Sequence, residues 1–252
     1  MHALGIIPAR YASSRFPGKP LVNISGRSMI QRVYEQALKC PALNEVVVAT
    51  DDQRIFDHVT TFGKAIMTSP DHQSGTDRCE EALKLLNYCN KYAENDIVVN
   101  IQGDEPLIDP GQIRQVISGF SDPGRQIISL KKEIRSETDL QNPNVVKVVC
   151  DRSGNALYFS RSPIPFVRGE SPGAMPPKAS YKHLGMYGYR IRTLREIVAL
   201  PAGKLEQLES LEQLRWLEYG YNIFLETTEL ENVSIDTPED LKKIPANPDK
   251  TG

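Results

Sequence analysis

Short apolar runs alternate with amphipathic segments through the first hundred residues, and this order constrains the fold more than any other feature of the sequence. Four apolar runs predict buried strands, at residues 3–7, 46–50, 65–68 and 96–101. Three intervening segments carry apolar side chains at helical spacing, at residues 28–40, 53–62 and 77–92. Because strand, helix and strand in succession form a right-handed crossover, we predict an α/β fold with a mixed, mostly parallel central sheet and helices on both faces.

A cation-rich loop follows the first predicted strand, between Pro8 and Leu21, and its prolines disfavour helix. Its charged and hydroxyl side chains are Arg10, Ser13, Ser14, Arg15 and Lys19. Guanidinium, ammonium and hydroxyl groups together suit a polyphosphate, whereas the alternative is a loop whose charges only meet solvent. Ligands of open α/β sheets bind beyond the carboxyl ends of the strands, so the position of this loop favours phosphate binding.

Several other cofactor and catalytic motifs are absent from the sequence. A Walker A loop would need Gly in place of Ser13 and Ser or Thr in place of Pro20, and the chain has no G-x-G-x-x-G segment. No serine lies in a G-x-S-x-G elbow, and the four cysteines form no C-x-x-C pair. These absences argue against a dinucleotide cofactor, a serine nucleophile of that type and a zinc site.

Charge and hydropathy exclude two classes of partner. The 252 residues include 30 basic and 32 acidic side chains, which gives a net charge of −2, so no overall field draws the chain to nucleic acid or to a membrane surface. No apolar run approaches the length that spans a bilayer, and the first residues lead into a strand without a signal peptide. We therefore expect a cytoplasmic protein.

The pattern changes after Gly124, where full helices no longer separate the apolar runs. Further strands are predicted at residues 126–134, 145–150, 156–160, 183–190 and 223–227. Residues 205–219 predict one helix, and Thr237 and Pro238 predict the cap and first residue of a short last helix. The proline- and glycine-rich residues 166–179 predict a loop, to which no role is assigned.

Two carboxylates are candidate metal ligands. Asp104 follows the fourth predicted strand, and Asp236 lies just before the last predicted helix. Magnesium is typically held by one or two carboxylates together with substrate oxygens and water, and it disperses the charge that phosphoryl transfer concentrates. The sequence therefore predicts Mg²⁺ at Asp104 and Asp236, with a turn carboxylate and a helix cap as the respective alternatives.

Seven segments of the chain, taken in order, carry a resemblance to a known family. They are PARYASSRFPGKPL (8–21), DHQSGTDR (71–78), NIQGDEP (100–106), ALYFSRSPIP (156–165), HLGMYGYR (183–190), LEQLR (211–215) and DTPEDL (236–241). The first and third segments alone resemble sugar nucleotidyltransferases in general. Together the seven segments resemble the 3-deoxy-D-manno-octulosonate (Kdo) cytidylyltransferase family.

The resemblance implies a Rossmann-like nucleotidyltransferase fold with a smaller insertion for substrate binding and dimerisation. On this basis we expect a single domain over residues 1–245, with a nucleotide-binding half (1–123), a sugar-binding and dimerisation half (124–245) and a frayed tail (246–252). The implied reaction joins CTP and Kdo into CMP-Kdo and pyrophosphate, with Mg²⁺, in a homodimer that serves lipopolysaccharide synthesis.

The resemblance also implies roles for individual residues. It places Arg10, Arg15 and Lys19 on the triphosphate, beside the loop hydroxyls of Ser13 and Ser14. It places Asp104 and Asp236 on the metal, with Arg15, Lys19 and Asp104 as the catalytic groups. Near the cytidine it places Ser74, Gly75 and Gln102. In the pocket for the sugar acid it places Arg78, Arg161, His183, Tyr187, Glu209 and Gln213.

Each residue of the expected sugar pocket has an ordinary structural alternative. Arg78 could pair on the surface with Asp77 or Glu81, and Arg161 could be a solvent-facing strand residue. His183 could be a structural histidine that shares a strand face with Tyr187. The remaining pair, four residues apart on the helix predicted over 205–219, could belong to a polar helix face; it consists of Glu209 and Gln213.

The expected chemistry is a single in-line displacement, in which the anomeric hydroxyl of Kdo attacks the α-phosphorus of CTP and no protein nucleophile takes part. Two alternatives are open. A cytidylyltransferase for another sugar acid, such as sialic acid, would keep the chemistry and change the acceptor. A non-catalytic CTP-binding protein would bind the nucleotide without releasing pyrophosphate, and Asp104 would then not need to lie near the basic loop.

Overall fold

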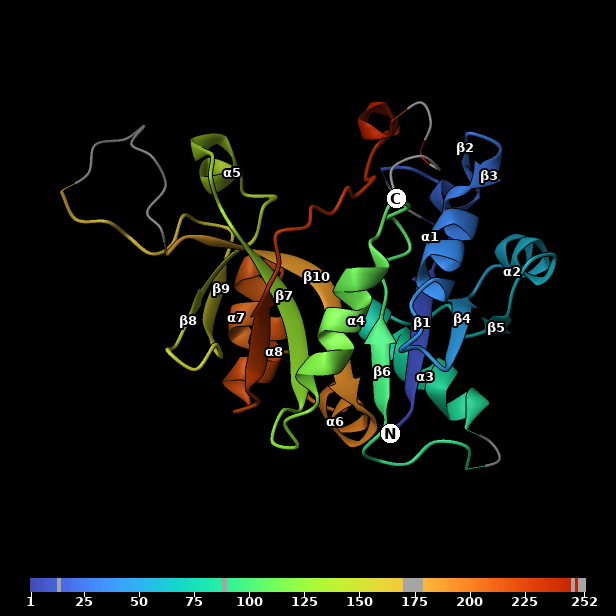
Figure 1. The fold of residues 1–252 in the computed structure, drawn as a ribbon, viewed down its shortest axis with the longest axis horizontal. Coiled ribbons are helices and arrows are strands. Elements are labelled where there is room, and N and C mark those ends of the chain that lie inside the picture. The colour runs from blue at the N-terminus through green and yellow to red at the C-terminus, as the bar shows by residue number, and fades with distance from the viewer. Residues whose placement is uncertain (13–14, 88–89, 170–178, 246–247, 249–252) are drawn as a thin grey trace.

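A nine-stranded sheet organises the chain in the computed structural model, which describes residues 1–12, 15–87, 90–169, 179–245 and 248 (Figure 1). The strands of the main path, in spatial order, are β11 (Ile223–Thr227), β7 (Ile127–Glu133), β10 (Tyr181–Arg190), β6 (Ile97–Asn100), β1 (Ala3–Ala9), β4 (Glu45–Thr50) and β5 (Ala65–Met67). A hairpin of β8 (Lys147–Cys150) and β9 (Ala156–Ser160) extends from β10.

The sheet is mixed and mostly parallel along this path. The pairs β6–β1, β1–β4, β4–β5 and β7–β11 are parallel, and β10 is antiparallel to both β6 and β7. Parallel strands end at the same edge of a sheet, so the loops after β1 and β6 lie beside each other. The predicted fold class is therefore confirmed.

Helices cover both faces of the sheet (Figure 1). One apolar cluster packs the sheet against α1 (Met29–Leu38), α2 (Gln53–Thr60) and α4 (Pro110–Gly119). A second cluster packs the opposite face against α3 (Gly75–Leu86), α6 (Ile191–Val198) and α8 (Gln213–Glu218). The shorter elements are α5 (Glu137–Gln141), α7 (Lys204–Glu209), the 3₁₀ helices η1 (Lys19–Leu21) and η2 (Pro238–Lys243), and a small hairpin of β2 (Asn23–Ile24) and β3 (Arg27–Ser28). No helix among the described residues is long and apolar enough to cross a bilayer.

Two element boundaries near the predicted site differ from the sequence prediction. Strand β1 continues through Pro8 to Ala9, because β6 pairs with β1 only as far as Ile6 and leaves one side of Pro8 without a strand partner. Helix α3 begins at Gly75 rather than at Asp77, because the hydroxyl of Ser74 accepts a hydrogen bond from the backbone N–H of Asp77 and caps the helix.

The single helix predicted over residues 205–219 is wrong. Ser210 adopts a left-handed conformation with φ of 52°, which separates α7 from α8. Glu209 therefore ends one helix and Gln213 begins the next, and they do not form an i, i+4 pair on one helix face. Helices α5 and α6 were also not predicted; both are short, and α6 directly follows the last residue of β10.

The chain beyond β11 returns to the first loop. Ile235 is fully buried against Ile24 and Met29 in a third apolar cluster, which holds the C-terminal segment on the β2–β3 hairpin. The backbone N–H of Ile235 also donates to the carbonyl of Asp104, 3.0 Å away. These contacts fix Asp236, the next residue, at the edge of the sheet where β1 and β6 end.

Gly188 tests how tightly β10 packs beneath α4. A Cβ atom at Gly188 would lie 2.6 Å from Cγ1 of Val116 and 2.7 Å from Cε2 of Phe120. We expect Gly188→Ala to lower the free energy of unfolding by about 1–3 kcal/mol, as overpacking of a well-packed core does. Denaturant unfolding followed by circular dichroism measures it.

Gly185→Ala is the matched control on the same strand. The nearest atom to a Cβ at Gly185 is Nε2 of Gln102, 3.9 Å away, so we expect a change within about 0.5 kcal/mol. Equal losses in the two variants would contradict this account of the packing.

Candidate functional site

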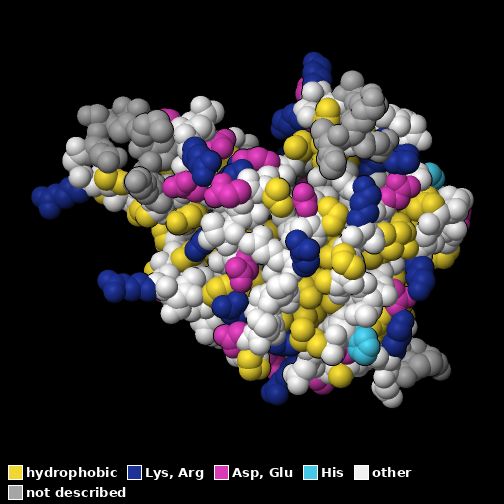
Figure 2. Space-filling view, in the orientation of Figure 1, with side chains coloured by type: hydrophobic (Ala, Val, Ile, Leu, Met, Phe, Trp, Pro, Cys, Tyr) yellow, Lys and Arg dark blue, Asp and Glu magenta, His cyan; other side chains and the backbone are white. Residues whose placement is uncertain are grey.

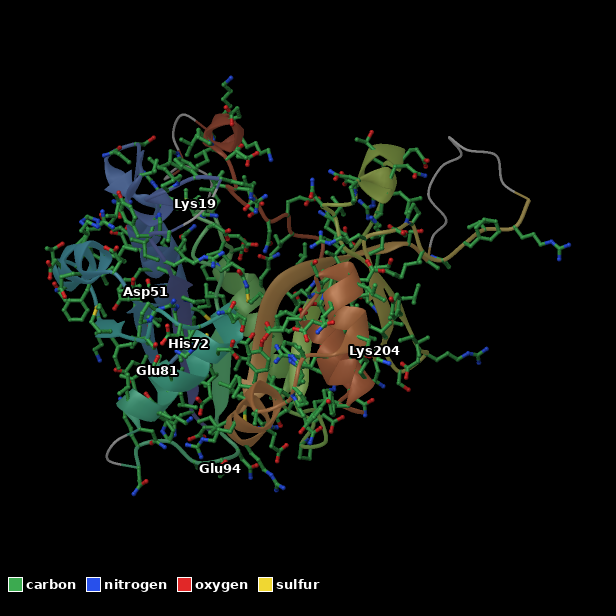
Figure 3. The ribbon with its side chains drawn as sticks, turned by 180° about the vertical axis from the view of Figure 1, so that it is seen from behind. Lys19, Asp51, His72, Glu81, Glu94 and Lys204 are labelled. Atoms are coloured by element: carbon green, nitrogen blue, oxygen red, sulfur yellow. The ribbon has the colours of Figure 1, made fainter. Side chains whose placement is uncertain are left out.

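A cavity of about 270 Å³ lies beyond the carboxyl ends of β1 and β6. Lys19 marks this end of the sheet in Figure 3, and Glu94, before β6, marks the opposite end. Nine residues predicted to bind substrate or metal line the cavity: Arg10, Arg15, Lys19, Ser74, Gly75, Arg78, Gln102, Asp104 and Asp236. Ser13 and Ser14, which were also predicted here, lie outside the described residues.

An ammonium group lies between the two candidate metal ligands. Nζ of Lys19 is 2.8 Å from Oδ2 of Asp104 and 3.6 Å from Oδ1 of Asp236. Arg15 donates from Nη2 to the same oxygen of Asp236, at 3.1 Å. Two cations and two carboxylates from three separate segments thus meet at one point. The Asp236 side chain is 43% exposed and that of Asp104 is 25% exposed, so both remain accessible from the cavity.

These two carboxylates have the chemistry of a magnesium site that is completed by substrate. One ammonium contacts oxygens of both side chains, so a small cation can be shared between them. No cluster of three or more His, Cys, Asp or Glu side chains suited to a metal occurs in the described part of the chain. A protein site with two carboxylates suits Mg²⁺, which keeps several waters and takes its other oxygens from phosphates.

The first turn of α3 forms one wall of the cavity. Ser74 caps this helix and Gly75 begins it, and both residues line the cavity. A Cβ atom at Gly75 would lie 3.2 Å from Cγ of Pro8, so the end of β1 and the start of α3 pack closely. The backbone N–H groups of Ser74 and Asp77 donate to each other's side chains, which leaves those of Gly75 and Thr76 for a bound molecule.

A second cavity, of about 370 Å³, adjoins the first, with which it shares Gln102, Asp104 and Asp236. Gln102 donates from Nε2 to the carbonyl of Gly185, at 2.7 Å, which ties the loop after β6 to β10. The other walls of this cavity are formed by Glu105, residues 144–146 and 182–184, Asn232 and Ser234. Figure 2 shows a hollow at the upper edge of the molecule, between the lobe that carries α5 and the lobe that carries η2.

His183 is a member of the expected sugar pocket that lines the second cavity. Its ring contacts those of Phe159 and Tyr187, with centroids 5.1 and 5.2 Å away, and its Nε2 is 2.8 Å from Oγ of Ser129. Burial among these groups lowers the pKa of His183 to about 3. The prediction that His183 and Tyr187 share a strand face is confirmed.

Arg161 and Glu209 form a bonded pair near the end of β9. Arg161 donates from its backbone N–H to Oε2 of Glu209, at 2.9 Å, and from Nε to the carbonyl of Glu209, at 2.7 Å. Ser160 donates to the other carboxylate oxygen, at 2.6 Å. Burial raises the pKa of Glu209, but these hydrogen bonds outweigh it and hold the pKa below the usual value. The reading of Arg161 as a solvent-facing strand residue is therefore wrong.

Arg78 lies apart from the other expected sugar residues. Its buried guanidinium donates to Oδ2 of Asp51 at 2.9 Å and to the hydroxyl of Thr68 at 2.6 Å, and it lines the first cavity next to Ser74. A surface pair with Asp77 or Glu81 is therefore the wrong alternative. The structure places Arg78 in the wall of the first cavity and outside the lining of the second.

Two polar pairs near the cavities escaped the sequence analysis. Asn232 donates to the buried carboxyl of Glu105 at 2.6 Å, and burial together with the charge of Asp104 raises the pKa of Glu105 to about 8. His72 lines the first cavity and contacts the carboxylate of Glu81 (Figure 3). Glu105 and His72 both lie in segments that carry the family resemblance. That resemblance was the only sign in the sequence that they belong near the site, because the sequence does not show burial or hydrogen-bond partners.

The depressed pKa of His183 predicts a dependence of stability on pH. The unfolded chain binds a proton at His183 below its ordinary pKa of 6.5, whereas the folded chain does so only near pH 3. This residue should therefore lower the free energy of unfolding as the pH falls from 6.5 toward 3. An NMR titration of the imidazole should show neutral His183 throughout pH 5–8, and a midpoint near 6.5 would contradict the prediction.

Comparisons with known proteins agree with this geometry. The family profile described as cytidylyltransferase matches residues 4–243. The chain is 51% identical over 249 residues to a 3-deoxy-manno-octulosonate cytidylyltransferase of Parabacteroides distasonis, with 96% of each chain covered. It is 49% identical over 241 residues to an 8-amino-3,8-dideoxy-manno-octulosonate cytidylyltransferase of Shewanella frigidimarina, with 94% of this chain and 95% of the relative covered.

A solved structure is similar over almost the whole chain. It is the CMP:2-keto-3-deoxy-manno-octonic acid synthetase complexed with CTP, which is 43% identical to this chain with a TM-score of 0.87. The match covers 97% of each chain. The elements that line both cavities therefore lie within the matched part of the chain.

Proposed function

The chain belongs to the cytidylyltransferase family and, within it, to the 3-deoxy-manno-octulosonate cytidylyltransferases, and on that basis we propose that it transfers the cytidylyl group of CTP to Kdo. The products are CMP-Kdo and pyrophosphate. The observation that carries the proposal is the convergence of Arg15, Lys19, Asp104 and Asp236 on one cavity that the first turn of α3 also lines.

The charged side chains of the first cavity determine where each part of CTP binds. The triphosphate lies against Arg10, Arg15 and Lys19, because guanidinium and ammonium groups are the strongest partners of phosphate oxygens. The cytidine lies toward Ser74 and Gly75, where backbone groups can read the edge of the base. The α-phosphorus then lies near the boundary with the second cavity.

The second cavity receives the sugar acid. Neutral His183 and Gln102 line this cavity and provide donors and acceptors for a molecule with one carboxylate and many hydroxyls, whereas the bonded pair of Arg161 and Glu209 lies outside its lining. In the reaction, a bond forms between the anomeric oxygen and the α-phosphorus, and the bond from this phosphorus to the bridging oxygen breaks. Pyrophosphate leaves with that electron pair, and the anomeric hydroxyl loses its proton.

Asp104 and Asp236 would hold Mg²⁺ in this site. When bound, the ion disperses the negative charge of the triphosphate and favours the ionised form of a hydroxyl that it contacts. Lys19 neutralises the same two carboxylates in the free protein and is within reach of the phosphates that arrive with the metal. Catalysis then rests on positioning and on charge neutralisation by Arg15 and Lys19.

We also propose a homodimer that acts in the cytoplasm, where CTP is made, and supplies lipopolysaccharide synthesis. Support for the dimer comes from large apolar side chains exposed in the second half of the chain. Leu157 on β9 is 62% exposed, Phe166 is 88% exposed and Leu208 on α7 is 83% exposed. Exposed apolar groups of this size favour burial against another protein surface. A solution mass of one protomer would refute the dimer.

Pyrophosphate release tests the substrate and the metal together. We expect release with CTP and Kdo, and at least about tenfold lower kcat/KM with sialic acid, because the acceptor pocket is built for one sugar acid. The 8-amino analogue of Kdo is the stricter comparison. Removing divalent ions with EDTA should abolish release, and adding Mg²⁺ should restore it. Tight binding of CTP without release would favour a nucleotide-binding protein instead.

Lys19→Ala tests the charged centre of the site. Loss of the ammonium should lower kcat by about 10²-fold or more, because it removes charge stabilisation of the transferring phosphoryl group. The matched control is Lys204→Ala, because Lys204 is an exposed lysine at the start of α7, away from Lys19 in Figure 3. The assignment of Lys19 fails if the folded Lys19→Ala protein turns over at the rate of the control.

A further inference from the structure

Glu212 connects the second half of the chain to the nucleotide cavity. It immediately precedes α8, and its carboxylate accepts a hydrogen bond from the hydroxyl of Thr76, with Oγ1 2.8 Å from Oε2. Nη2 of Arg215 donates to the other oxygen at 3.1 Å. Glu212 thus hydrogen-bonds to the residue that follows Gly75, and Gly75 lines the cavity.

The hydrogen bond to Glu212 fixes the direction of the Thr76 hydroxyl. Ser74 is held within the turn itself, because its Oγ accepts from the backbone N–H of Asp77 at 3.1 Å. Thr76 is 2% exposed, and its hydroxyl donates to the carboxylate of Glu212. The turn that begins α3 is therefore held from outside its own helix, by a side chain more than 130 residues further along the chain.

The charge of Glu212 bears on which part of the nucleotide can lie at this turn. A helix N-terminus ordinarily favours an anion. At α3, however, the carboxylate of Glu212 lies directly behind the first turn and repels a further negative group such as a phosphate. A neutral base is not penalised in this way. Arg15 and Lys19, which suit the triphosphate, come from the loop after β1, whereas the guanidinium of Arg78 on α3 is already paired with Asp51.

Glu212 also faces the acceptor side of the molecule. Burial and then the charge of Glu212 raise the pKa of Tyr187 well above its usual value, which places this carboxylate in the electrostatic surroundings of a predicted sugar-pocket residue. Glu212 itself is 24% exposed at its side chain, and Arg215 is 12% exposed. The group is therefore an internal anion with defined partners and is not part of a solvated helix face.

We propose that Glu212 is a positioning residue for CTP: it holds the turn of Ser74, Gly75 and Thr76 in the arrangement that accepts the cytidine. The proposal rests on the transfer reaction proposed above, and it assigns a role in the site to a partly buried carboxylate that the sequence did not point to. It acts on the nucleotide through Thr76 and the turn to which Thr76 belongs, and it touches no reacting atom.

Glu212→Gln tests the proposal, with pyrophosphate release as the assay. Glutamine keeps the size of the side chain but loses one acceptor oxygen and presents an N–H group to donors. We expect the KM for CTP to rise by about tenfold or more, because small misplacements around a bound substrate have large effects. The kcat and the KM for Kdo should change less than about twofold, a split that general loss of structure would not produce.

Glu206→Gln is the matched control. Oε2 of Glu206 lies 3.1 Å from Nε of the same Arg215 and accepts from the backbone N–H of Gly203, but none of its hydrogen bonds or ion pairs reaches α3. This variant also deprives Arg215 of a carboxylate, so its melting temperature should fall as in Glu212→Gln, while its KM for CTP should stay at the wild-type value.

Thr76→Val keeps the test decisive if Glu212→Gln does not fold, because it removes only the hydroxyl that donates to Glu212. It should raise the KM for CTP by about threefold or more, and the double variant should show less than the product of the two single effects. Unchanged KM for CTP in both folded variants, or equal changes in both substrates, would overturn the proposal. A wild-type protein without pyrophosphate release would instead refute the proposed function.

Discussion

The ammonium of Lys19, held between the carboxylates of Asp104 and Asp236, is the contact on which the rest of the site depends. The three residues come from the loop after β1, the loop after β6 and the segment before η2. The first two meet because β1 and β6 are parallel neighbours, so their carboxyl ends share one edge of the sheet. The third arrives because buried Ile235 anchors the C-terminal segment on the β2–β3 hairpin.

The opposite charges of this centre can pair in two ways, one without substrate and one with substrate. Without substrate, Lys19 and Arg15 neutralise the two carboxylates, which would otherwise repel each other at short range. In the reaction we propose, phosphate oxygens would become the partners of these cations, and the two carboxylates would be free to hold a metal ion. The carboxylate of Glu212, behind the first turn of α3, would oppose an anion there and so favour the triphosphate at Arg15 and Lys19.

The parts of the fold and of the site that follow from local sequence pattern and chain order could be predicted from the sequence. The parallel strands around β1 and the carboxylate at Asp104 follow from apolar periodicity and the strand-end rule, and Asp236 was found as a polar residue before a capped helix. Prediction failed where tertiary contacts override periodicity. Ser210 breaks a helix that the leucine spacing predicts to be continuous. The hydrogen bond from Thr76 to Glu212 could not be predicted either, because the two residues are far apart in the sequence.

A crystal structure of this protein with CTP and Mg²⁺ is the most direct test of the central claim. The account predicts triphosphate oxygens on Arg15 and Lys19, the metal ion on Asp104 and Asp236, and the cytosine beside the turn that begins α3. A nucleotide bound with its phosphates at that turn, or in a part of the protein away from Lys19, would contradict the account.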